Sequence, residues 1–478
     1  MIVREHHESA QCITFANNAK MTGVKNVYGV MRFNRWTLNN RTATSDHNPL
    51  PINQQKSNYE RRLYFISFPF AVRVGDIFGF GQYGQYWVIQ YYDGLNRAKN
   101  GYWSDSKPNW KYVSPSMVSQ GYTLEANQGY ILELNLNAMA ADNTTFWSNG
   151  ISTIELYFPS TVAQETLKQT NCTIPALNAD YECKINRGTG TDGDRRVKDS
   201  YWRCIGVPSY NLYNSTLTDG SGNEIRWNTD YTWKADNAAF PFIYVWNKTD
   251  NTLTPQATSN FTFQPMHAYL TQIKSAIVWT AVSAKPSSIV ARRARKEADN
   301  EHEWRIELKQ DTTFLDQTYV RMTNMEQVTD SFDFGQDLVK ELNSRSNIYT
   351  YIGYEKVAGN SMTVHSDQTT VIPVGLNIRA DGEYTFAMPD GTSGVGVTLI
   401  DNVANTRTNL SALDYTVTLT AGEHTNRFFL EISPVQNMPT DIEAVSGQPS
   451  EVRKVMIDGI LYIVRDGKMY DARGARVE

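Results

Sequence analysis

Few residues of the chain have the types and spacing that catalysis or cofactor binding would need. The string Gly79–Gly84 has the form G-x-G-x-x-G of a dinucleotide-binding loop. Such a loop must open a helix whose N-terminus holds a pyrophosphate, but an aromatic strand from Tyr86 is expected here, which favours a glycine-rich turn. Cys204 and His267 could pair as nucleophile and base, but Cys204 lies in a strand of buried type, which favours a structural role.

Asp192 and Asp194 flank a glycine, and this spacing of two carboxylates could serve a calcium ion. The full spacing of an EF-hand loop is missing, so a polar turn is the simpler interpretation. The sequence also lacks the G-x-S-x-G, H-E-x-x-H and G-x-x-x-x-G-K-[ST] patterns of common enzymes. We therefore expect no catalytic residues, no cofactor and no metal beyond the calcium candidate.

Binding chemistry has more support, because large aromatic residues gather in two segments that read as loops. The first segment carries Tyr92, Trp103 and Trp110 among charged residues, and the second carries Trp227 and Trp233. Exposed rings beside polar groups can stack on the apolar faces of sugars or on side chains of a partner protein. The alternative is that these rings close the open ends of small β cores, in which case their removal would unfold the protein.

Composition excludes several other classes of protein. The chain has 478 residues, of which 41% are hydrophobic and 20% charged, and this balance is typical of folded, multi-domain proteins. The net charge of −5 provides no positive field for binding nucleic acid. No apolar run reaches the length of about 20 residues that a membrane-spanning helix needs. We expect neither a nucleic-acid partner nor a transmembrane segment.

The cysteines leave one question open. Cys172 and Cys183 flank a turn, and a disulfide between them would contribute about 3 kcal/mol on the chain-entropy model. Both could equally be buried thiols that act as small hydrophobic side chains.

The chain is expected to be mainly β. Tyrosine (27) outnumbers phenylalanine (19), and helical patterns are scarce. A sparse internal repeat relates Ile66–Pro69 to Ile205–Pro208 and Gly129-Tyr130 to Ala268-Tyr269, each displaced by 139 positions. Shared spacing with loops of different length predicts two copies of one β module, residues 61–162 and 163–284.

The remaining segments predict three further regions. Residues 1–60 are expected to be a truncated N-terminal strand region, and residues 285–303 a linker of mixed charge. Residues 304–434 predict an immunoglobulin-like β-sandwich, because short alternating strands follow one another between Asp-Gly turns. One short helix is expected in this domain, at Gly335–Leu342.

Residues 435–478 predict a linker and a small C-terminal β meander. Asp458-Gly459 and Asp466-Gly467 stand between apolar runs, which is a strong signal for hairpins, and Gly474 marks a third turn. A sheet of this size buries too little surface to be very stable alone, so it should dock on a neighbour or be recognised by a partner.

This tail, from Lys454 to Val477, resembles the C-terminal sorting domains of proteins exported by the type IX secretion system. The ending Tyr-Asp-x-x-Gly-x-x-Val carries most of the resemblance. The sandwich resembles the β domain often found before such tails, and the two modules resemble modules of the same surface proteins. The resemblance implies recognition by the secretion machinery through Asp458, Gly459, Asp466, Gly467, Tyr470, Gly474 and Val477.

The resemblance also implies a place at the outer-membrane surface or in the medium, reached with the help of a signal peptide. The segment after Met1 has no apolar stretch of that kind, so we expect either that Met1 is not the natural start or that leading domains were removed. The expected function is non-enzymatic adhesion or binding to a glycan or a host protein. The alternative is the accessory region of a secreted hydrolase whose catalytic domain lies upstream of Met1.

Overall fold

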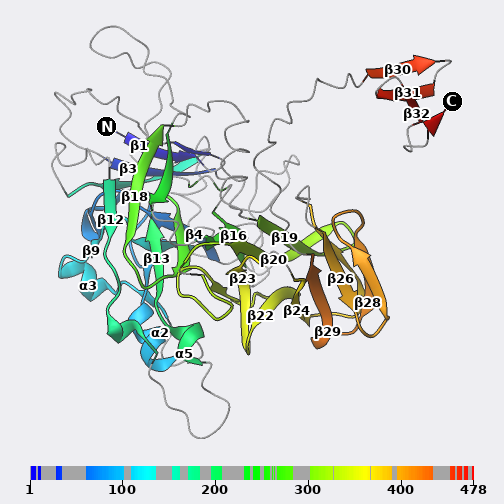
Figure 1. Cartoon of the computed structure of the whole chain (residues 1–478). Coiled ribbons are helices and arrows are strands. Elements are labelled where there is room, and N and C mark those ends of the chain that lie inside the picture. The colour runs from blue at the N-terminus through cyan, green and yellow to red at the C-terminus, as the bar shows by residue number, and fades with distance from the viewer. Residues whose placement is uncertain are drawn as a thin grey trace, which may run out of the picture. The chain divides into compact units, whose positions relative to one another are not determined.

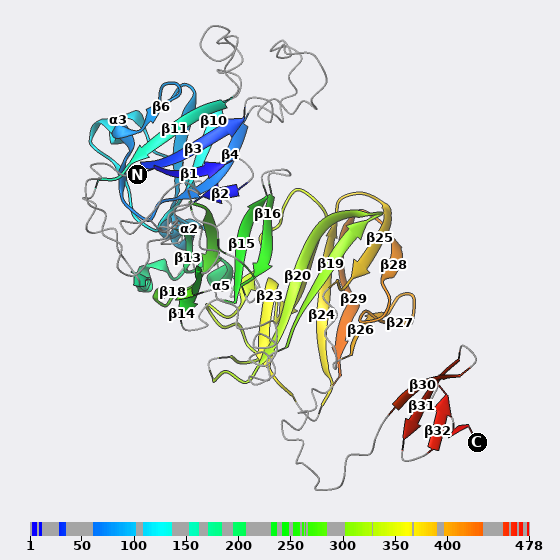
Figure 2. The ribbon, with the colours of Figure 1, turned by 90° about the horizontal axis from the view of Figure 1, so that it is seen from above.

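The structure is a computed structural model, shown in Figure 1 and, turned by 90°, in Figure 2. The chain divides into two compact units, Met1–Val435 and Gln436–Glu478. Strands dominate both units, so the prediction of a mainly β protein is confirmed. The structure describes residues 2–6, 9–11, 28–34, 61–101, 109–135, 153–161, 171–183, 195–206, 231–236, 241–247, 252–258, 261, 263, 266–283, 302–326, 328–365, 368–389, 396–433, 453–457, 460–465, 468–471 and 476–477.

Each of the two repeated segments contains a four-stranded antiparallel sheet. Sheet 1 has the order β4 (Arg61–Ser67), β10 (Gly129–Asn135), β7 (Trp87–Tyr92) and β8 (Trp110–Tyr112). Sheet 2 has the order β13 (Trp202–Gly206), β17 (Ala268–Gln272), β15 (Phe242–Asn247) and β16 (Thr252–Ala257). The two sheets therefore share one strand order.

The registers of the β4–β10 and β13–β17 pairs also coincide after a shift of 139 residues. In sheet 1, Tyr130 pairs with Ile66, and in sheet 2 Tyr269 pairs with Ile205. Both tyrosines and both isoleucines are buried. Because a slip of one residue would turn every side chain to the other face, equal registers give the two copies equivalent cores.

The two copies contact each other through a pair of equivalent bridges, in which each position is contributed once by the first copy and once by the second. Ile66 of the first copy forms a bridge with His267 of the second. Gln128 of the first copy forms a bridge with Ile205 of the second, and these are the equivalents of His267 and Ile66. Reciprocal contacts of this kind are the pattern of an isologous interface, so the two copies are related by a local pseudo-two-fold axis.

Gly206 makes the close approach at this axis possible. The backbone N–H of Ser67 donates to the carbonyl of Met266 (3.0 Å), and the N–H of Gly206 donates to the carbonyl of Asn127 (2.8 Å). A Cβ atom on Gly206 would lie 2.2 Å from the Cβ of Ser67, its equivalent in the first copy. The space between positions 67 and 206 therefore holds the side chain of Ser67 and has no room for a second one.

A second sheet covers one face of each four-stranded sheet. In the first copy its order is β2 (Ser9–Gln11), β1 (Ile2–His6), β3 (Tyr28–Asn34), β11 (Thr153–Pro159) and β6 (Phe78–Gly79). In the second copy it is β12 (Asn171–Ile174), β18 (Ile277–Ser283) and β14 (Tyr231–Asp236). β3 pairs with β11 along its whole length, so the expected boundary at residue 60 divides strands of one sheet.

The first sandwich has a continuous core. Met31 and Leu156 from the covering sheet pack with Trp87, Ile89 and Leu132 from sheet 1. The corresponding core of the second copy joins Ile277 to residues of sheet 2. The short elements in the described part of these two copies include β5 (Val72–Arg73), β9 (Thr123–Leu124), α3 (Pro115–Ser119), η3 (Val74–Asp76) and η5 (Ala179–Tyr181).

Residues 302–433 form the β-sandwich, as one long sheet that folds over a single core (Figure 2). Buried side chains from strands far apart in the sheet, among them Trp304, Phe386 and Phe428, share this core. The strand order is β27 (Thr406–Asn409), β26 (Val397–Asp401), β29 (Gly422–Ile432), β24 (Thr370–Ile378), β22 (Asn347–Ile352), β23 (Glu355–Thr363), β20 (Thr313–Thr323), β19 (His302–Gln310), β25 (Gly382–Ala387) and β28 (Tyr415–Leu419).

The prediction of a short helix at Gly335–Leu342 was wrong. Leu338 and Val339 form a strand, β21 (Leu338–Val339), which pairs with β23. Their buried side chains pack against Phe242 and Tyr244 of sheet 2, so tertiary contacts override the local pattern. This apolar cluster joins the sandwich to the two copies.

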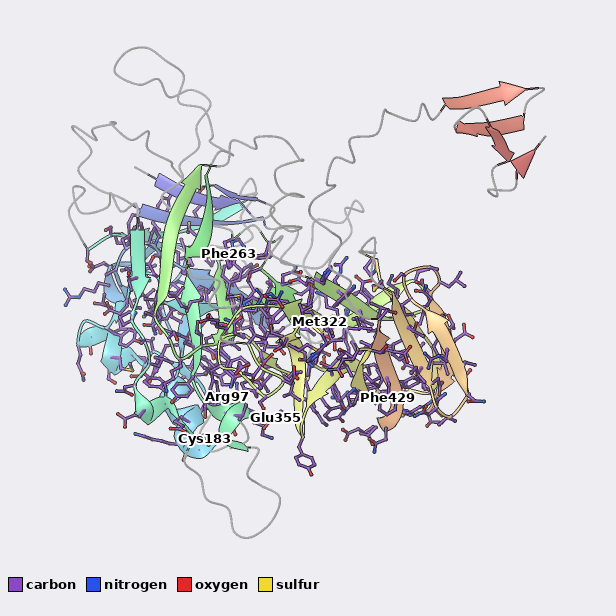
Figure 3. All side chains as sticks on the ribbon, in the orientation of Figure 1. Arg97, Cys183, Phe263, Met322, Glu355 and Phe429 are labelled. Carbon is purple, nitrogen blue, oxygen red and sulfur yellow. The ribbon has the colours of Figure 1, made fainter. Side chains whose placement is uncertain are left out.

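A charged side chain also joins these three parts. Arg97 lies in α2 (Gly94–Asn100) of the first copy and is labelled in Figure 3. Its guanidinium contacts Asp199, the last residue of α5 (Arg195–Asp199), at 3.4 Å and Glu341 of the sandwich at 2.5 Å. It also lies over the ring of Trp202, with 4.1 Å from Cζ to the ring centroid. One buried cation thus contacts all three parts of the unit.

The C-terminal unit is a four-stranded antiparallel meander, as predicted. Its strands are β30 (Arg453–Ile457), β31 (Ile460–Arg465), β32 (Lys468–Asp471) and β33 (Arg476–Val477). Tyr470 pairs with Ile463 and Arg476, and Val477 pairs with Met469. Across the described ranges of the whole chain, no helix has the length and apolar character that spanning a bilayer requires.

Candidate ligand-binding surface

Two of the predicted binding residues pack between the repeated copies. Tyr92 is buried, and its ring centroid lies 4.9 Å from that of Trp110, which is half-buried. Trp110 meets Phe65 edge to face at 5.3 Å, and Phe65 stacks on Trp246 of sheet 2 at 5.0 Å. Arg97 donates to the hydroxyl of Tyr92 (3.0 Å). These contacts are those of rings that close a core, which was the alternative interpretation.

Most other predicted site residues lie outside the described part of the chain. Trp233 lies on β14, opposite Ala281 of β18. Tyr470 and Val477 lie on the strands of the C-terminal meander, as given above. The residues outside the described ranges are Trp103, Trp227, Asp192, Asp194, Asp458, Gly459, Asp466, Gly467 and Gly474.

An exposed ring lies near this cluster, on the face of sheet 1 that packs on sheet 2. Tyr112 is 48% exposed, and its hydroxyl donates to Oε2 of Glu133 (2.9 Å). The side-chain amide of Gln90 donates to the same oxygen (2.7 Å). Glu133 and Gln90 are both buried. A buried carboxylate, oriented by an amide, therefore holds the exposed ring in place.

Strand periodicity brings these side chains to one face. Gln90 is opposite Tyr112 in the pairing of β7 with β8, and opposite Ile131 in the pairing of β7 with β10. Residues two apart on a strand share a face, so Trp110 and Tyr112 share one, as do Ile131 and Glu133. Phe65 and Ile131 of this face pack with residues of sheet 2, and the same face carries Gln90, Glu133 and Tyr112.

This arrangement suits the recognition of a polar ligand with an apolar face. A tyrosine ring offers a flat apolar surface, and its hydroxyl oxygen, which donates to Glu133, can still accept a hydrogen bond from a hydroxyl group of the ligand. Because the hydrogen bond to Glu133 already holds the ring, binding loses less side-chain entropy than it would with a mobile tyrosine. We call Gln90, Trp110, Tyr112 and Glu133 the Tyr112 surface.

Sequence reasoning missed three residues of this surface. Tyr112 could have been found, because it stands two residues after Trp110 in a strand-like segment and so shares its face. Gln90 and Glu133 also interrupt apolar strands with polar side chains, and such residues need partners when they are buried. No sequence signal shows that these two strands are neighbours.

The other candidate sites have structural roles. Gly79, Gly81 and Gly84 all have positive φ, and β7 follows them without a helix, so the interpretation as a glycine-rich turn is confirmed. Burial raises the pKa of the Cys204 thiol, which keeps it protonated at neutral pH and unsuited to nucleophilic attack. Cys183 is a buried thiol, so the structure does not contain the disulfide with Cys172. Among the described residues, no group of three or more His, Cys, Asp or Glu side chains could hold a metal ion.

Comparison with known proteins gives one match. Residues 283–432 match the sequence model of a family described as a domain of unknown function (DUF8693). The matched residues cover the β-sandwich from β19 to β29. No curated protein and no solved structure matches the chain.

Proposed function

We propose that the protein is a non-enzymatic binding protein of the outer-membrane surface or the medium, and that the Tyr112 surface contacts a glycan. The observation that carries this proposal is the exposed ring of Tyr112, held by the buried carboxylate of Glu133. Exposed aromatic rings are common on protein surfaces, but the Tyr112 ring is held by a buried carboxylate that a buried amide orients, and this fixes its position for contact. A host protein is the other partner that such a surface could meet.

The contacts that join the parts of the unit also support a role in binding. The two copies share an interface, and Arg97 and the cluster around Tyr244 join both copies to the sandwich. A surface built on strands of such a scaffold keeps its geometry, which favours recognition without rearrangement.

Replacing Tyr112 with alanine should raise the Kd for the glycan about 10-fold, because the stacking surface is lost. The measurement is a glycan array with the full chain, followed by titration of the best ligand with each variant. Tyr112→Phe keeps the ring but removes its hydrogen bond to Glu133, so a smaller loss is expected.

The matched control is Tyr354→Ala, because Tyr354 is 85% exposed and lies in the sandwich, in the turn between β22 and β23. This variant should bind as the unchanged protein does. Unaltered binding by a folded Tyr112→Ala variant would exclude the Tyr112 surface as the site. If the unchanged protein binds no glycan on the array, the glycan proposal itself fails.

Export is proposed to depend on the C-terminal unit. Its meander is a separate compact unit with consecutive antiparallel strand pairs, which is a form that a secretion machine could recognise as a whole. Because the tail resembles type IX sorting domains, we propose that the machine is the type IX secretion system.

Deletion of residues 436–478 should keep the protein inside cells of a bacterium that has a type IX system. Immunoblots of cells and medium would measure this distribution. The matched test joins the same residues to a periplasmic reporter, with the reversed sequence as the control. Unchanged export of the shortened protein would contradict the proposed role of the tail.

A further inference from the structure

A lysine and an aspartate meet in the interior of the β-sandwich. Lys340 directly follows β21, and Asp316 lies on β20. Nζ of Lys340 is 2.5 Å from Oδ2 of Asp316, and both side chains are 0% exposed. The backbone N–H of Ile348 also donates to Oδ2 (2.8 Å). This pair lies apart from the Tyr112 surface and has no part in the proposed binding.

The surroundings satisfy a charged pair poorly. An ammonium group has three N–H donors, and within the described ranges the carboxylate of Asp316 is the acceptor that Lys340 meets. No donor of the described residues meets Oδ1 of Asp316 in hydrogen-bonding geometry. Buried charges that lack hydrogen bonds are costly, so the charged forms are disfavoured here.

Desolvation favours the neutral form of both side chains. Burial raises the pKa of Asp316 and lowers the pKa of Lys340. Their mutual attraction, and for Asp316 also the backbone N–H groups of Ile348 and Gln317, oppose this only in part. A neutral amine is a nucleophile, and a neutral carboxylic acid is its electrophilic partner. Held together in the interior, the two groups have a very high effective concentration.

We propose that Lys340 and Asp316 condense to form an intramolecular amide bond. The lone pair of Nζ attacks Cγ of Asp316, and a new C–N bond forms while the bond from Cγ to Oδ1 breaks. Oδ1 leaves as water with its own acid proton and one proton from the amine. Oδ2 becomes the amide carbonyl and keeps the hydrogen bond from Ile348. The reaction needs no oxidant or reductant.

The product satisfies the site better than the pair does. An amide has one N–H in place of the three donors of an ammonium, and the oxygen without a donor is the one that leaves. The bond would link β20 covalently to the segment that holds Glu341, which contacts Arg97 at the junction of the three parts. It would therefore strengthen the sandwich where the two copies dock on it.

The test is the intact mass of the full, folded chain, measured after denaturation. We expect a mass lower than that of the sequence by one water molecule, and a branched peptide joining Lys340 to Asp316 after proteolysis. Asp316→Asn can form the same amide with loss of ammonia, so its deficit should be one ammonia. Lys340→Met should show its full sequence mass.

The unchanged protein gives the decisive result, so the test does not depend on the folding of any variant. A folded protein with its full sequence mass would overturn the proposal and leave a buried hydrogen-bonded pair. A deficit of one water that maps to other residues would overturn it equally.

Discussion

Replacement of Arg97 by methionine should lower the free energy of unfolding by about 3–5 kcal/mol, because it leaves two buried carboxylates without their cation. Asp199 and Glu341 both contact Arg97, and both are buried. Burial already raises the pKa of Asp199, and Arg97 offsets that effect only in part. The loss of the contact with the Trp202 ring adds to the effect. Urea unfolding followed by tryptophan fluorescence would measure it.

The control for Arg97 is an arginine whose ion pair is exposed. Arg407 contacts Glu431 on the sandwich and is 56% exposed, so Arg407→Met should cost less than about 1 kcal/mol. Addition of Asp199→Asn and Glu341→Gln to Arg97→Met should recover part of the stability, since it removes the uncompensated charges. Equal, small losses in the two single variants would show that Arg97 does not hold the three parts together.

Replacement of Gly206 by serine should destabilise the protein by about 1–3 kcal/mol, because the new side chain meets Ser67 across the pseudo-two-fold axis. The added Cβ would lie 2.2 Å from the Cβ of Ser67 and 2.4 Å from its Oγ. Neither strand can shift easily, because Gly206 N and Ser67 N both donate hydrogen bonds across the axis. Chemical denaturation of the full chain would measure the change.

The pseudo-symmetry predicts a specific rescue. In the double variant Ser67→Gly with Gly206→Ser, the two side chains exchange places, and the single hydroxyl again has room. We expect the double variant to recover most of the stability lost in Gly206→Ser, with a coupling energy of about 1–3 kcal/mol. Ser67→Gly alone should cost about 1 kcal/mol, because the hydrogen bond from its hydroxyl to His267 is lost. Additive losses in the double variant would argue against equivalent environments at the two positions.

Much of the architecture follows from local patterns. Alternation of apolar and polar residues identified the strands of the sandwich, and Asp-Gly pairs located the hairpins of the C-terminal meander. These signals are local, because the period of a strand and the chemistry of a turn depend on a few neighbouring residues. The spacing of 139 residues matches the registers of the β4–β10 and β13–β17 pairs, since these equivalent strands keep equivalent partners.

Prediction from the sequence failed where pairing between distant segments determines the secondary structure. The strands before residue 60 belong to a sheet with β11, which lies far along the chain. Leu338 and Val339 form a strand because β23 and sheet 2 offer partners for their backbone and side chains. The environment of an aromatic residue depends in the same way on what packs against it, so Tyr92 is buried while Tyr112 is exposed.

The sequence by itself determined the class of fold, the repeat and the hairpin tail, because each arises from residue types at short or regular spacing. Only the tertiary structure decided that Arg97 contacts Asp199 and Glu341, that Lys340 meets Asp316, and that Gly206 faces Ser67. These contacts join residues that are distant in the chain, and their energies depend on burial. Burial is a property of the assembled core, so it cannot be inferred from any single segment of the sequence.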